Sequence, residues 1–505
     1  MQEKIRRVDE ISGIIAAEKS LGHKVVHCHG VFDLLHPGHI RHFSEAKAQG
    51  DKLVVSLTPD RFVNKGPGRP TFNEKLRSEQ LAALACVDFV VLNDSPDAVS
   101  IIKKVCPNLY VKGSEYRNHS EDVTGKISEE AQAVEEVGGQ IYYTDDIVFS
   151  SSHLINRFFD EDAARIAPFM DQFKEQFSLD QILASIDSLN DLKILVVGDA
   201  IIDQYQYVTP LGQSGKGQQI TAVLHENEFF LGGSLIIANH LAGFAKKVDL
   251  VTAVGENCPF QSKIEKELLE NVTAHFIKSD EPTLLKKRYV QKDGKTLSKL
   301  FETYSSCRPH LNHDQSNQVI SLLNQAKGYD LVVACDFGNG FTNPAIVSAL
   351  SQMPTFLAVN TQTNSGNRGF NVITNYQRAD YISLNEPEIR LAAHDRDSRL
   401  EQVVQDIVSI LHAKAASITR GSEGVLFQTS KDSFRIPALT MQAIDRVGAG
   451  DSYLALSSMC VAKGLPPLLA GFIGSVAAAI DIQIIGNREA INKVGLCKYI
   501  TRLMK

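Results

Sequence analysis

Hydrophobic and polar positions along the first 160 residues follow two alternating patterns. Short apolar runs bounded by turn residues are typical of buried strands, and the segments between them carry apolar residues at helical spacing. Repeated strand–helix units predict a parallel sheet that is covered by helices on both faces. The predicted strands span residues 24–30, 52–57, 87–92 and 109–113, and the predicted helices span residues 39–50, 72–85 and 96–105.

A second alternation of the same kind follows a more polar, strand-free stretch at residues 161–189. The amphipathic spacing of that stretch predicts a helical linker. We therefore expect an α/β protein of two domains, 1–160 and 190–505, each a mostly parallel sheet with helices on both faces. The apolar runs that predict strands of the second domain lie at residues 192–203, 247–255, 329–340, 354–360, 379–388 and 415–421.

The composition narrows the classes of partner. A chain of 505 residues with 43% hydrophobic and 22% charged residues is typical of a globular protein long enough for two cores. Its net charge of -7, without a block of like charges, argues against a nucleic-acid partner or a membrane-binding patch. This charge balance favours small-molecule ligands instead. Scattered cysteines without a C-x-x-C pair and a start without a signal-peptide pattern predict a cytoplasmic location.

The stretch HGVFDLLHPGHIRH at residues 29–42 closes the first predicted strand and opens the first predicted helix. Ligands of open α/β sheets bind at the carboxyl edge of the strands, and the amides of a helix N-terminus favour phosphate. The imidazoles of His36 and His39 can donate hydrogen bonds to a phosphate there, and Gly38 lets the backbone approach a nucleotide. The stretch therefore predicts a site for nucleotide phosphates.

The order G-x-F-D-x-L-H-x-G-H at residues 30–39 resembles the signature of the cytidylyltransferase-like nucleotidylyltransferases, which have a Rossmann-like fold. Residues 24–158 as a whole are similar to the adenylyltransferase half of bacterial bifunctional heptose kinase/adenylyltransferases. Glycerol-phosphate cytidylyltransferases are less similar around residues 111–116. The further matching positions are Lys65, Arg69, Pro70, Arg77, Lys112 and the serines Ser150, Ser151 and Ser152.

This resemblance implies transfer of a nucleotidyl group to a sugar 1-phosphate with release of pyrophosphate. Imidazoles, positive side chains, helix amides and Mg²⁺ are sufficient for such a reaction, because it depends on positioning and charge stabilisation. The resemblance to the heptose branch favours ATP as the nucleotide. CTP stays open, because none of the motifs reads a base. The resemblance assigns catalysis to His36, His39, Lys65 and Arg77, and nucleotide or phosphate binding to Gly30, Phe32, Asp33, Gly38, Lys112, Ser151 and Ser152.

A second phosphate site is predicted at residues 444–459, IDRVGAGDSYLALSSM. Gly448, Ala449 and Gly450 lead into an apolar helical pattern, so their amides can form an anion hole at a helix start. The carboxylate of Asp451 can take a proton from a sugar hydroxyl while the amides stabilise the transferred phosphoryl group. This arrangement predicts a kinase.

Residues 190–490 resemble the ribokinase-like sugar kinases, and most of all the heptose kinase half of the same bifunctional enzymes. The resemblance implies ATP as phosphate donor, Asp451 as catalytic base, and a homodimer formed through the lid on the sugar side. The matched residues are Asp199, Asp203, Gly232, Gly233, Lys286 and Arg288 for the sugar, Thr419, Gly421, Gly448, Ala449 and Gly450 for the nucleotide, and Asn385 and Glu388 for indirect organisation of Mg²⁺.

Three positions depart from the family pattern. Ile236 stands where the family usually has an asparagine that contacts the sugar, and Asn360-Thr361 stands where relatives show Asp-Pro. Arg446 follows Asp445 where a small hydroxyl residue or valine is usual. Because the loss of amide donors changes a polar pocket, we expect a sugar other than the usual heptose 7-phosphate. We also expect Arg446 to face an anionic group of the bound substrate.

Two functions of the whole chain are compatible with these sites. In the first, the C-terminal domain phosphorylates a sugar at its anomeric oxygen and the N-terminal domain joins that phosphate to a nucleotide. The resembling enzymes usually carry the kinase first, so the domain order is expected to be reversed here. In the second, only the nucleotidylyltransferase is active, and the C-terminal domain is a ligand-binding, regulatory or scaffold module.

Overall fold

The computed structural model describes residues 2–63, 70–113, 126–144, 161–215, 217–293, 296–305, 310–367 and 369–504. The chain forms two compact units, Met1–Ala167 with Cys497–Lys505 and Pro168–Leu496. Each unit contains a sheet with helices on both faces, which confirms the predicted α/β class and two-domain architecture. The domain boundaries predicted from the sequence stay predictions.

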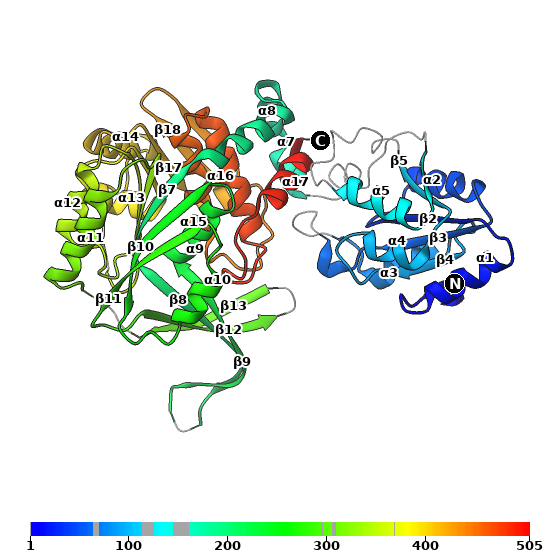
Figure 1. Cartoon of the computed structure of the whole chain (residues 1–505). Helices are drawn as coiled ribbons and strands as arrows, with labels where there is room; N and C mark the ends of the chain where they lie inside the picture. The colour runs from blue at the N-terminus through cyan, green and yellow to red at the C-terminus, as the bar shows by residue number, and fades with distance from the viewer. Residues whose placement is uncertain are drawn as a thin grey trace. The chain divides into compact units, whose positions relative to one another are not determined.

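The sheet of the first unit has the strand order β1-β4-β3-β2-β5-β6, and all neighbouring strands are parallel (Figure 1). The four strands predicted from the sequence correspond to β2, β3, β4 and β5. The elements are β1 (Ile5–Arg6), α1 (Ile11–Ser20), β2 (Val25–Gly30), α2 (Pro37–Ala48), β3 (Lys52–Leu57), α3 (Glu74–Ala82), β4 (Phe89–Leu92), α4 (Val99–Val105), β5 (Leu109–Gly113), α5 (Lys126–Glu136) and β6 (Gln140–Thr144).

Successive residues of β2 point to opposite faces of this sheet, as the period of a strand requires. Val26 shares one core with Phe43 of α2 and Leu81 of α3. Val25 shares the core on the other face with Ile11 of α1 and Ile101 of α4. Burial on both faces explains why the first four residues of the strand are all buried instead of alternating between buried and exposed.

The large sheet of the second unit has the order β11-β10-β7-β14-β15-β16-β17-β18-β19. Its neighbours are parallel except for β17 with β18 and β18 with β19. The strands are β7 (Lys193–Gly198), β10 (Lys247–Gly255), β11 (Val272–Ser279), β14 (Leu331–Asp336), β15 (Phe356–Thr361), β16 (Tyr381–Asn385), β17 (Ala415–Thr419), β18 (Val425–Thr429) and β19 (Ser433–Ile436).

Helices cover both faces of the large sheet (Figure 1). Helices α11 to α14 pack on one face, in a core that includes Val319, Ile346, Ile389 and Val403. Helices α9, α15 and α16 lie on the other face. The helices of this unit are α9 (Ser234–Ala242), α10 (Gln261–Glu267), α11 (His313–Gln325), α12 (Pro344–Gln352), α13 (Glu386–Ala393), α14 (Leu400–Leu411), α15 (Ala449–Ala462) and α16 (Pro467–Asp481); α17 (Lys493–Met504) follows.

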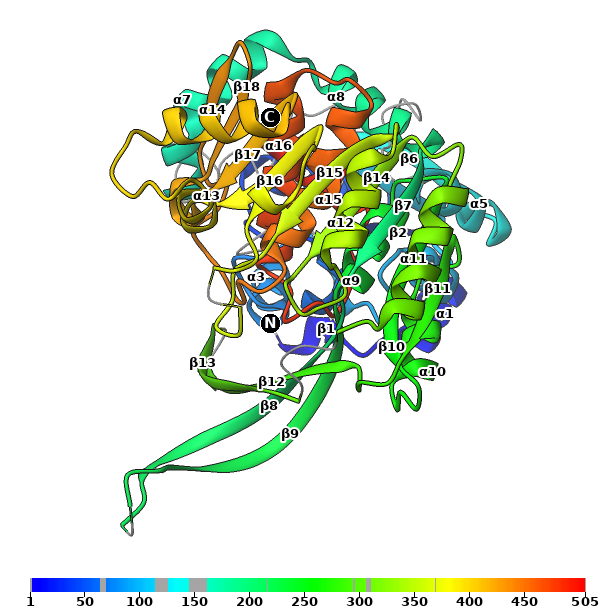
Figure 2. The same cartoon turned by 90° about the vertical axis from the view of Figure 1, so that its left-hand side faces the viewer.

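A third sheet, sheet C, belongs to the second unit and was not predicted from the sequence. Its order is β13-β12-β8-β9, and the β8–β9 hairpin extends away from the rest of the unit (Figure 2). The apolar run at residues 192–203 predicts one strand, but the structure ends β7 at Gly198 and begins β8 at Ala200. The strands are β8 (Ala200–Gln213), β9 (Ile220–Gly233), β12 (Leu284–Asp293) and β13 (Thr296–Tyr304).

Two helices, α7 (Glu161–Gln176) and α8 (Leu179–Asp187), occupy the stretch that the sequence predicts to be a helical linker. A capping box between Ser178 and Gln181 satisfies the first amides of α8. Phe173 of α7 is buried against Phe472 of α16, with ring centroids 4.2 Å apart. Within the described ranges, none of the helices has the length and apolar character needed to cross a membrane.

Candidate active sites

The start of α2 places two histidine rings against each other. His36 is the N-cap of α2, and Pro37 occupies the first helical position, where its fixed φ suits a helix start. His39 lies in the first turn, and the ring centroids of His36 and His39 are 3.9 Å apart. The chain reaches this point from Gly30, the last residue of β2. The structure therefore brings together the two imidazoles and the strand end.

His36 presents a hydrogen-bond donor to a ligand. Its Nδ1 accepts a hydrogen bond from the Gly38 amide at 3.2 Å, so the neutral ring carries its proton on Nε2. Burial lowers the pKa of His36, which keeps the ring neutral at pH 7. The Nε2 atom is buried and has no hydrogen-bond partner in the part of the chain that the structure describes. Because unpartnered buried donors are rare, this atom is available for an oxygen of a ligand.

Arg77 holds the loops around the histidines. Its side chain is fully buried in α3, and its guanidinium pairs with Asp60 at 2.7 Å. Every guanidinium nitrogen donates to a loop in this structure, and the contact of Arg77 with phosphate oxygens that the resemblance implies stays a prediction. The accepting carbonyls belong to Val31, Thr58 and Phe72.

Asp33 and Phe32 also help to fix the loops around the histidines. Asp33 is buried, and its carboxylate accepts hydrogen bonds from the amides of Thr71 at 2.6 Å and Phe72 at 3.3 Å. Phe32 has a left-handed φ of 47°, which is uncommon for a residue with a side chain, and its ring meets the edge of His39 at a centroid distance of 5.4 Å. Both residues therefore fix the loop that leads to the histidine pair.

Arg77→Met is expected to destabilise the first unit by about 3 kcal/mol, because it leaves buried carbonyls without donors and Asp60 without its partner. Arg61→Met is a matched control, since Arg61 is exposed and its guanidinium lies over the Phe62 ring. Thermal unfolding followed by circular dichroism would measure both variants. Equal unfolding temperatures for the two variants would contradict this role of Arg77.

Lys112, at the carboxyl end of β5, is paired within the protein. Its Nζ lies 2.6 Å from a carboxylate oxygen of Glu130 and 5.2 Å from the centroid of the Tyr110 ring. Tyr110 donates to the same carboxylate at 3.1 Å. The expected contact of Lys112 with phosphate therefore stays a prediction. The other predicted residues Lys65, Ser151 and Ser152 lie outside the described residues.

The turn before α15 forms a second helix-start site. Gly448 is the N-cap of α15 and has a left-handed φ of 96°. A Cβ at this position would lie 2.4 Å from Asn487 Oδ1 and 2.7 Å from Asp481 Oδ2, so only glycine fits. The amides of Ala449 and Gly450, which begin the helix, have no hydrogen-bond partner among the residues described. These two amides are the predicted anion hole.

Asp451 lies in the first turn of α15, one residue after those amides. Burial, together with repulsion from Asp203 and Glu388, raises the pKa of its carboxyl group to about 7, while Lys286 opposes the shift. A carboxylate whose pKa lies near the working pH is suited to accept a proton and to release it again. Asp451 therefore has the properties of a general base.

Several residues predicted to bind the sugar meet in sheet C, where they contribute to the electrostatic field at Asp451. Asp203 accepts two hydrogen bonds from Arg288, at 2.9 and 3.1 Å. Lys286 is buried, and desolvation lowers the pKa of its ammonium group. A Cβ at Gly232 would lie 2.6 Å from the Asp203 carboxylate, so a side chain there would displace it. Gly233 follows as the N-cap of α9.

Asp199, which is predicted to bind the sugar, and Ile236, which replaces a usual sugar-contacting asparagine, are both buried, and the sugar contact of Asp199 stays a prediction. Desolvation raises the pKa of Asp199 to about 7. Ile236 is 2% exposed and belongs to a helix, α9, whose residues are all buried. Ile236 therefore packs in the core. The Asp199 carboxylate fixes the backbone after β14, because it accepts hydrogen bonds from the amides of Phe337, Asn339 and Phe341.

Asn385 and Glu388 form a capping box at the start of α13. The Asn385 side chain accepts from the Glu388 amide at 2.8 Å, and the Glu388 carboxylate accepts from the Asn385 amide at 2.9 Å. The second carboxylate oxygen accepts from the Thr363 amide at 3.1 Å, and burial raises the pKa of Glu388 to about 6. The N-x-x-E spacing therefore has a structural explanation. Over the described ranges, no three His, Cys, Asp or Glu side chains are arranged to hold a metal.

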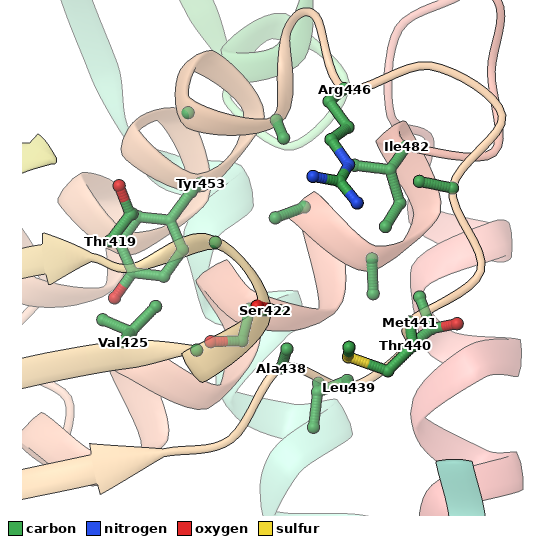
Figure 3. A pocket seen from close by; sticks show the side chains of 18 residues that line it. Thr419, Ser422, Val425, Ala438, Leu439, Thr440, Met441, Arg446, Tyr453 and Ile482 are labelled. Atoms are coloured by element: carbon green, nitrogen blue, oxygen red, sulfur yellow. The ribbon is translucent and has the colours of Figure 1, made fainter. Parts of the chain in front are cut away.

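A cavity of about 230 Å³ opens beside the start of α15 (Figure 3). Leu439, Met441 and other apolar side chains form most of its wall, which suits a flat nucleobase. Thr419 and Gly421, both predicted to bind nucleotide, line this cavity, and Gly450 lines it as well. The structure therefore brings the predicted nucleotide residues and the anion hole to one cavity. The loop that carries Leu439 and Met441 was missed, because it has no motif.

Asp445 anchors the turn before α15, a role that was not predicted. It is buried and accepts hydrogen bonds from the Tyr205 hydroxyl at 2.6 Å and the Gly486 amide at 3.0 Å. Lys299 Nζ lies 2.9 Å from its other oxygen. Tyr205 and Lys299 belong to sheet C, so this contact joins sheet C to the phosphate-binding turn. The next residue, Arg446, lines the cavity of Figure 3.

Comparison with protein families matches both units. The cytidylyltransferase-like family matches residues 27–158, and the pfkB family of carbohydrate kinases matches residues 191–493. These matches confirm the two predicted domain types.

Curated relatives described as "Bifunctional protein HldE" are similar over the N-terminal part of the chain. The protein from Geobacter metallireducens is 41% identical over 140 residues, which cover 27% of this chain and 27% of the relative. The protein from Azorhizobium caulinodans is 39% identical over 139 residues, which cover 27% of this chain and 28% of the relative. The chain thus spans about a quarter of the length of the curated relatives that it matches.

Among solved structures, the tetrameric inhibited form of phosphofructokinase-2 from Escherichia coli aligns with 62% of this chain and 100% of its own, with a TM-score of 0.51 and 13% identity. The same enzyme in complex with potassium aligns with 62% of this chain and 99% of its own, with a TM-score of 0.51 and 14% identity. At such low identity this likeness shows the fold alone. Because the pfkB match at residues 191–493 covers more than half of the sequence, the chain belongs to the pfkB family of carbohydrate kinases.

Proposed function

We propose that this chain makes a nucleotide-activated sugar in two steps. The C-terminal domain phosphorylates a sugar or sugar phosphate with ATP, and the N-terminal domain transfers a nucleotidyl group from ATP or CTP to the sugar 1-phosphate. The observation that carries the proposal is the presence in one chain of two helix starts that suit phosphate, each with side chains that can take part in the reaction. These groups are the imidazoles of His36 and His39 at α2 and the carboxylate of Asp451 at α15.

In the kinase step, the anomeric oxygen of the sugar attacks the γ-phosphorus of ATP while Asp451 takes the hydroxyl proton. The bond from the γ-phosphorus to the bridging oxygen breaks, and ADP leaves. The amides of Ala449 and Gly450 stabilise the charge on the transferred phosphoryl group. The neighbouring Lys286 and Asp203 would hold sugar hydroxyl groups, since both lie close enough to Asp451 to shift its pKa.

In the nucleotidyl step, a phosphate oxygen of the sugar 1-phosphate attacks the α-phosphorus of the nucleotide, and pyrophosphate leaves. Nε2 of His36 donates a hydrogen bond to an oxygen of that phosphorus, where negative charge increases in the transition state. No protein nucleophile is needed. Lys65 would neutralise charge on the phosphate oxygens, and Ser151 and Ser152 would contact the leaving phosphates, as the resemblance implies.

Magnesium would enter both sites with the nucleotide, because Mg²⁺ usually binds substrate phosphates and keeps several waters. Both carboxylate oxygens of Glu388 already accept backbone amides. We therefore propose that Asn385 and Glu388 act on the metal only through water molecules. The other ligands are small molecules, and we propose a cytoplasmic location and a homodimer.

Incubation of the full chain with each nucleoside triphosphate and a panel of sugars and sugar 1-phosphates tests the proposal, with products identified by mass spectrometry. We expect ADP and a phosphorylated sugar from one reaction, and pyrophosphate and a nucleotide sugar from the other. If no sugar yields ADP and Asp451→Ala leaves every activity unchanged, the C-terminal domain is a ligand-binding or regulatory module. If no pyrophosphate forms with any pair, the proposed nucleotidyl transfer is wrong.

A further inference from the structure

Arg446 is the only charged side chain among the described residues that line the cavity beside α15. Figure 3 shows it next to Ile482, with its guanidinium turned toward the cavity. The rest of the wall is apolar or carries neutral hydroxyl groups, as at Thr419 and Ser422. A nucleotide that enters this cavity brings several negative charges, and Arg446 is the one lining side chain able to compensate them.

Arg446 makes no ion pair or hydrogen bond with any residue that the structure describes. Two other arginines of the same unit behave differently: Arg420 pairs with Glu386 at 2.8 Å, and Arg488 pairs with Glu228 at 2.6 Å. Arginine presents a planar fork of donors that matches two phosphate oxygens at once. An arginine without an acidic partner in a cavity is therefore available to an anionic ligand.

The backbone on both sides of Arg446 is fixed. Asp445 is held by sheet C through Tyr205 and Lys299. Three residues after Arg446, Ala449 begins the helix whose first amides form the anion hole. Both Ala449 and Arg446 line the cavity, so the guanidinium and the first amides of α15 belong to the wall of one cavity.

We propose that Arg446 binds the polyphosphate of the nucleotide in the kinase site, and that it does not bind the sugar. This rests on the proposed kinase function of the C-terminal domain. It refines the expectation from the sequence, which left the anionic group unidentified. The guanidinium bonds oxygens of the terminal phosphates, so it holds ATP and neutralises the charge that builds on the leaving ADP. The ligand class is a nucleoside diphosphate or triphosphate.

The absence of tryptophan from the chain permits a test specific to this cavity. Met441 lines the cavity and is 49% exposed, so Met441→Trp introduces a single tryptophan, whose fluorescence is excited selectively and reports on this site and not on the first unit. Ser422 also lines the cavity, so Ser422→Trp provides a second reporter if the larger side chain at position 441 hinders binding. Each reporter is titrated with ADP and with adenosine, alone and combined with Arg446→Ala, Arg446→Lys or Arg435→Ala.

We expect Arg446→Ala to weaken ADP binding about 10- to 100-fold and adenosine binding less than about twofold, because only ADP carries the phosphates. Arg446→Lys should recover part of the loss, since it keeps the charge but not the fork of donors. Arg435→Ala should change neither affinity, because Arg435 is exposed and pairs with Glu401. In kinase assays, Arg446→Ala should raise KM for ATP and leave KM for the sugar within about twofold.

Three results would overturn the proposal. Unchanged ADP affinity in Arg446→Ala, with adenosine still bound, would show that Arg446 does not contact the nucleotide while the kinase site stands. Equal losses for ADP and adenosine would show that Arg446 only maintains the shape of the cavity. No response of either reporter to any nucleotide would remove the proposal together with the nucleotide role of the cavity.

Discussion

Replacement of His39 by alanine is expected to lower the rate of pyrophosphate release at least about 100-fold, because removal of one donor to the transition-state charge typically has an effect of that size. The ring of His39 lies 3.9 Å from that of His36, so its loss also frees the neighbouring ring to rotate away from the helix start. The measurement is a coupled pyrophosphate assay with saturating nucleotide and sugar 1-phosphate.

The matched control is His23→Ala. His23 lies before β2, is about one-third exposed and pairs with Glu18 at 2.6 Å, so its loss should leave the rate unchanged. The kinase reaction of His39→Ala should also proceed at the normal rate, since its groups belong to the other unit. A normal rate of pyrophosphate release from His39→Ala would show that the nucleotidyl site has been assigned wrongly.

Asp451→Asn is expected to lower ADP formation by about 10²- to 10⁴-fold, because the amide is nearly isosteric with the carboxylate but cannot accept the hydroxyl proton. Pyrophosphate release from an added sugar 1-phosphate should continue. Asp314→Asn is the matched control, since Asp314 occupies the first turn of α11 and is exposed. The Asp314→Asn variant should form ADP at the normal rate. Equal activities of the two variants would exclude Asp451 as the base.

The raised pKa of Asp451 also predicts the pH dependence of the kinase reaction. Only the deprotonated carboxylate can act as base, and its pKa is about 7. The value of kcat/KM for the sugar should therefore rise about tenfold per pH unit below pH 7 and become level above it. A profile that is flat between pH 5 and pH 7 would contradict this assignment.

The sheet of the first unit and the large sheet of the second unit could be predicted because their strands are buried on both faces. A strand such as β14, with every residue buried, is a continuous apolar run that stands out between turn residues. Sheet C could not be predicted in this way. Strand β8 changes from buried at Ile201 to 65% exposed at Leu211, so no single pattern of burial extends along it. The tyrosines Tyr205 and Tyr207, two residues apart, were the available sign of a strand.

The positions of His36, His39 and Asp451 could be predicted because each belongs to a helix start that directly follows a recognisable motif. The surroundings of Arg77 and Asp199 could not. Residue type does not tell whether a charged side chain faces a ligand or the backbone of a distant loop, and both side chains bond loops that come from other parts of the sequence. Only the folded chain shows which alternative holds.

The ion pair between Lys299 and Asp445 has a consequence for the hydrolysis of ATP in the absence of a sugar. If sheet C moves away from the large sheet, Asp445 loses both its ammonium partner and the Tyr205 hydroxyl, and the turn that supports Gly448 is released. ATP bound without a sugar under an open sheet C would then meet an incompletely formed anion hole. If the C-terminal domain is the proposed kinase, water would thus be a poor competitor for the γ-phosphoryl group while these two contacts of Asp445 are broken.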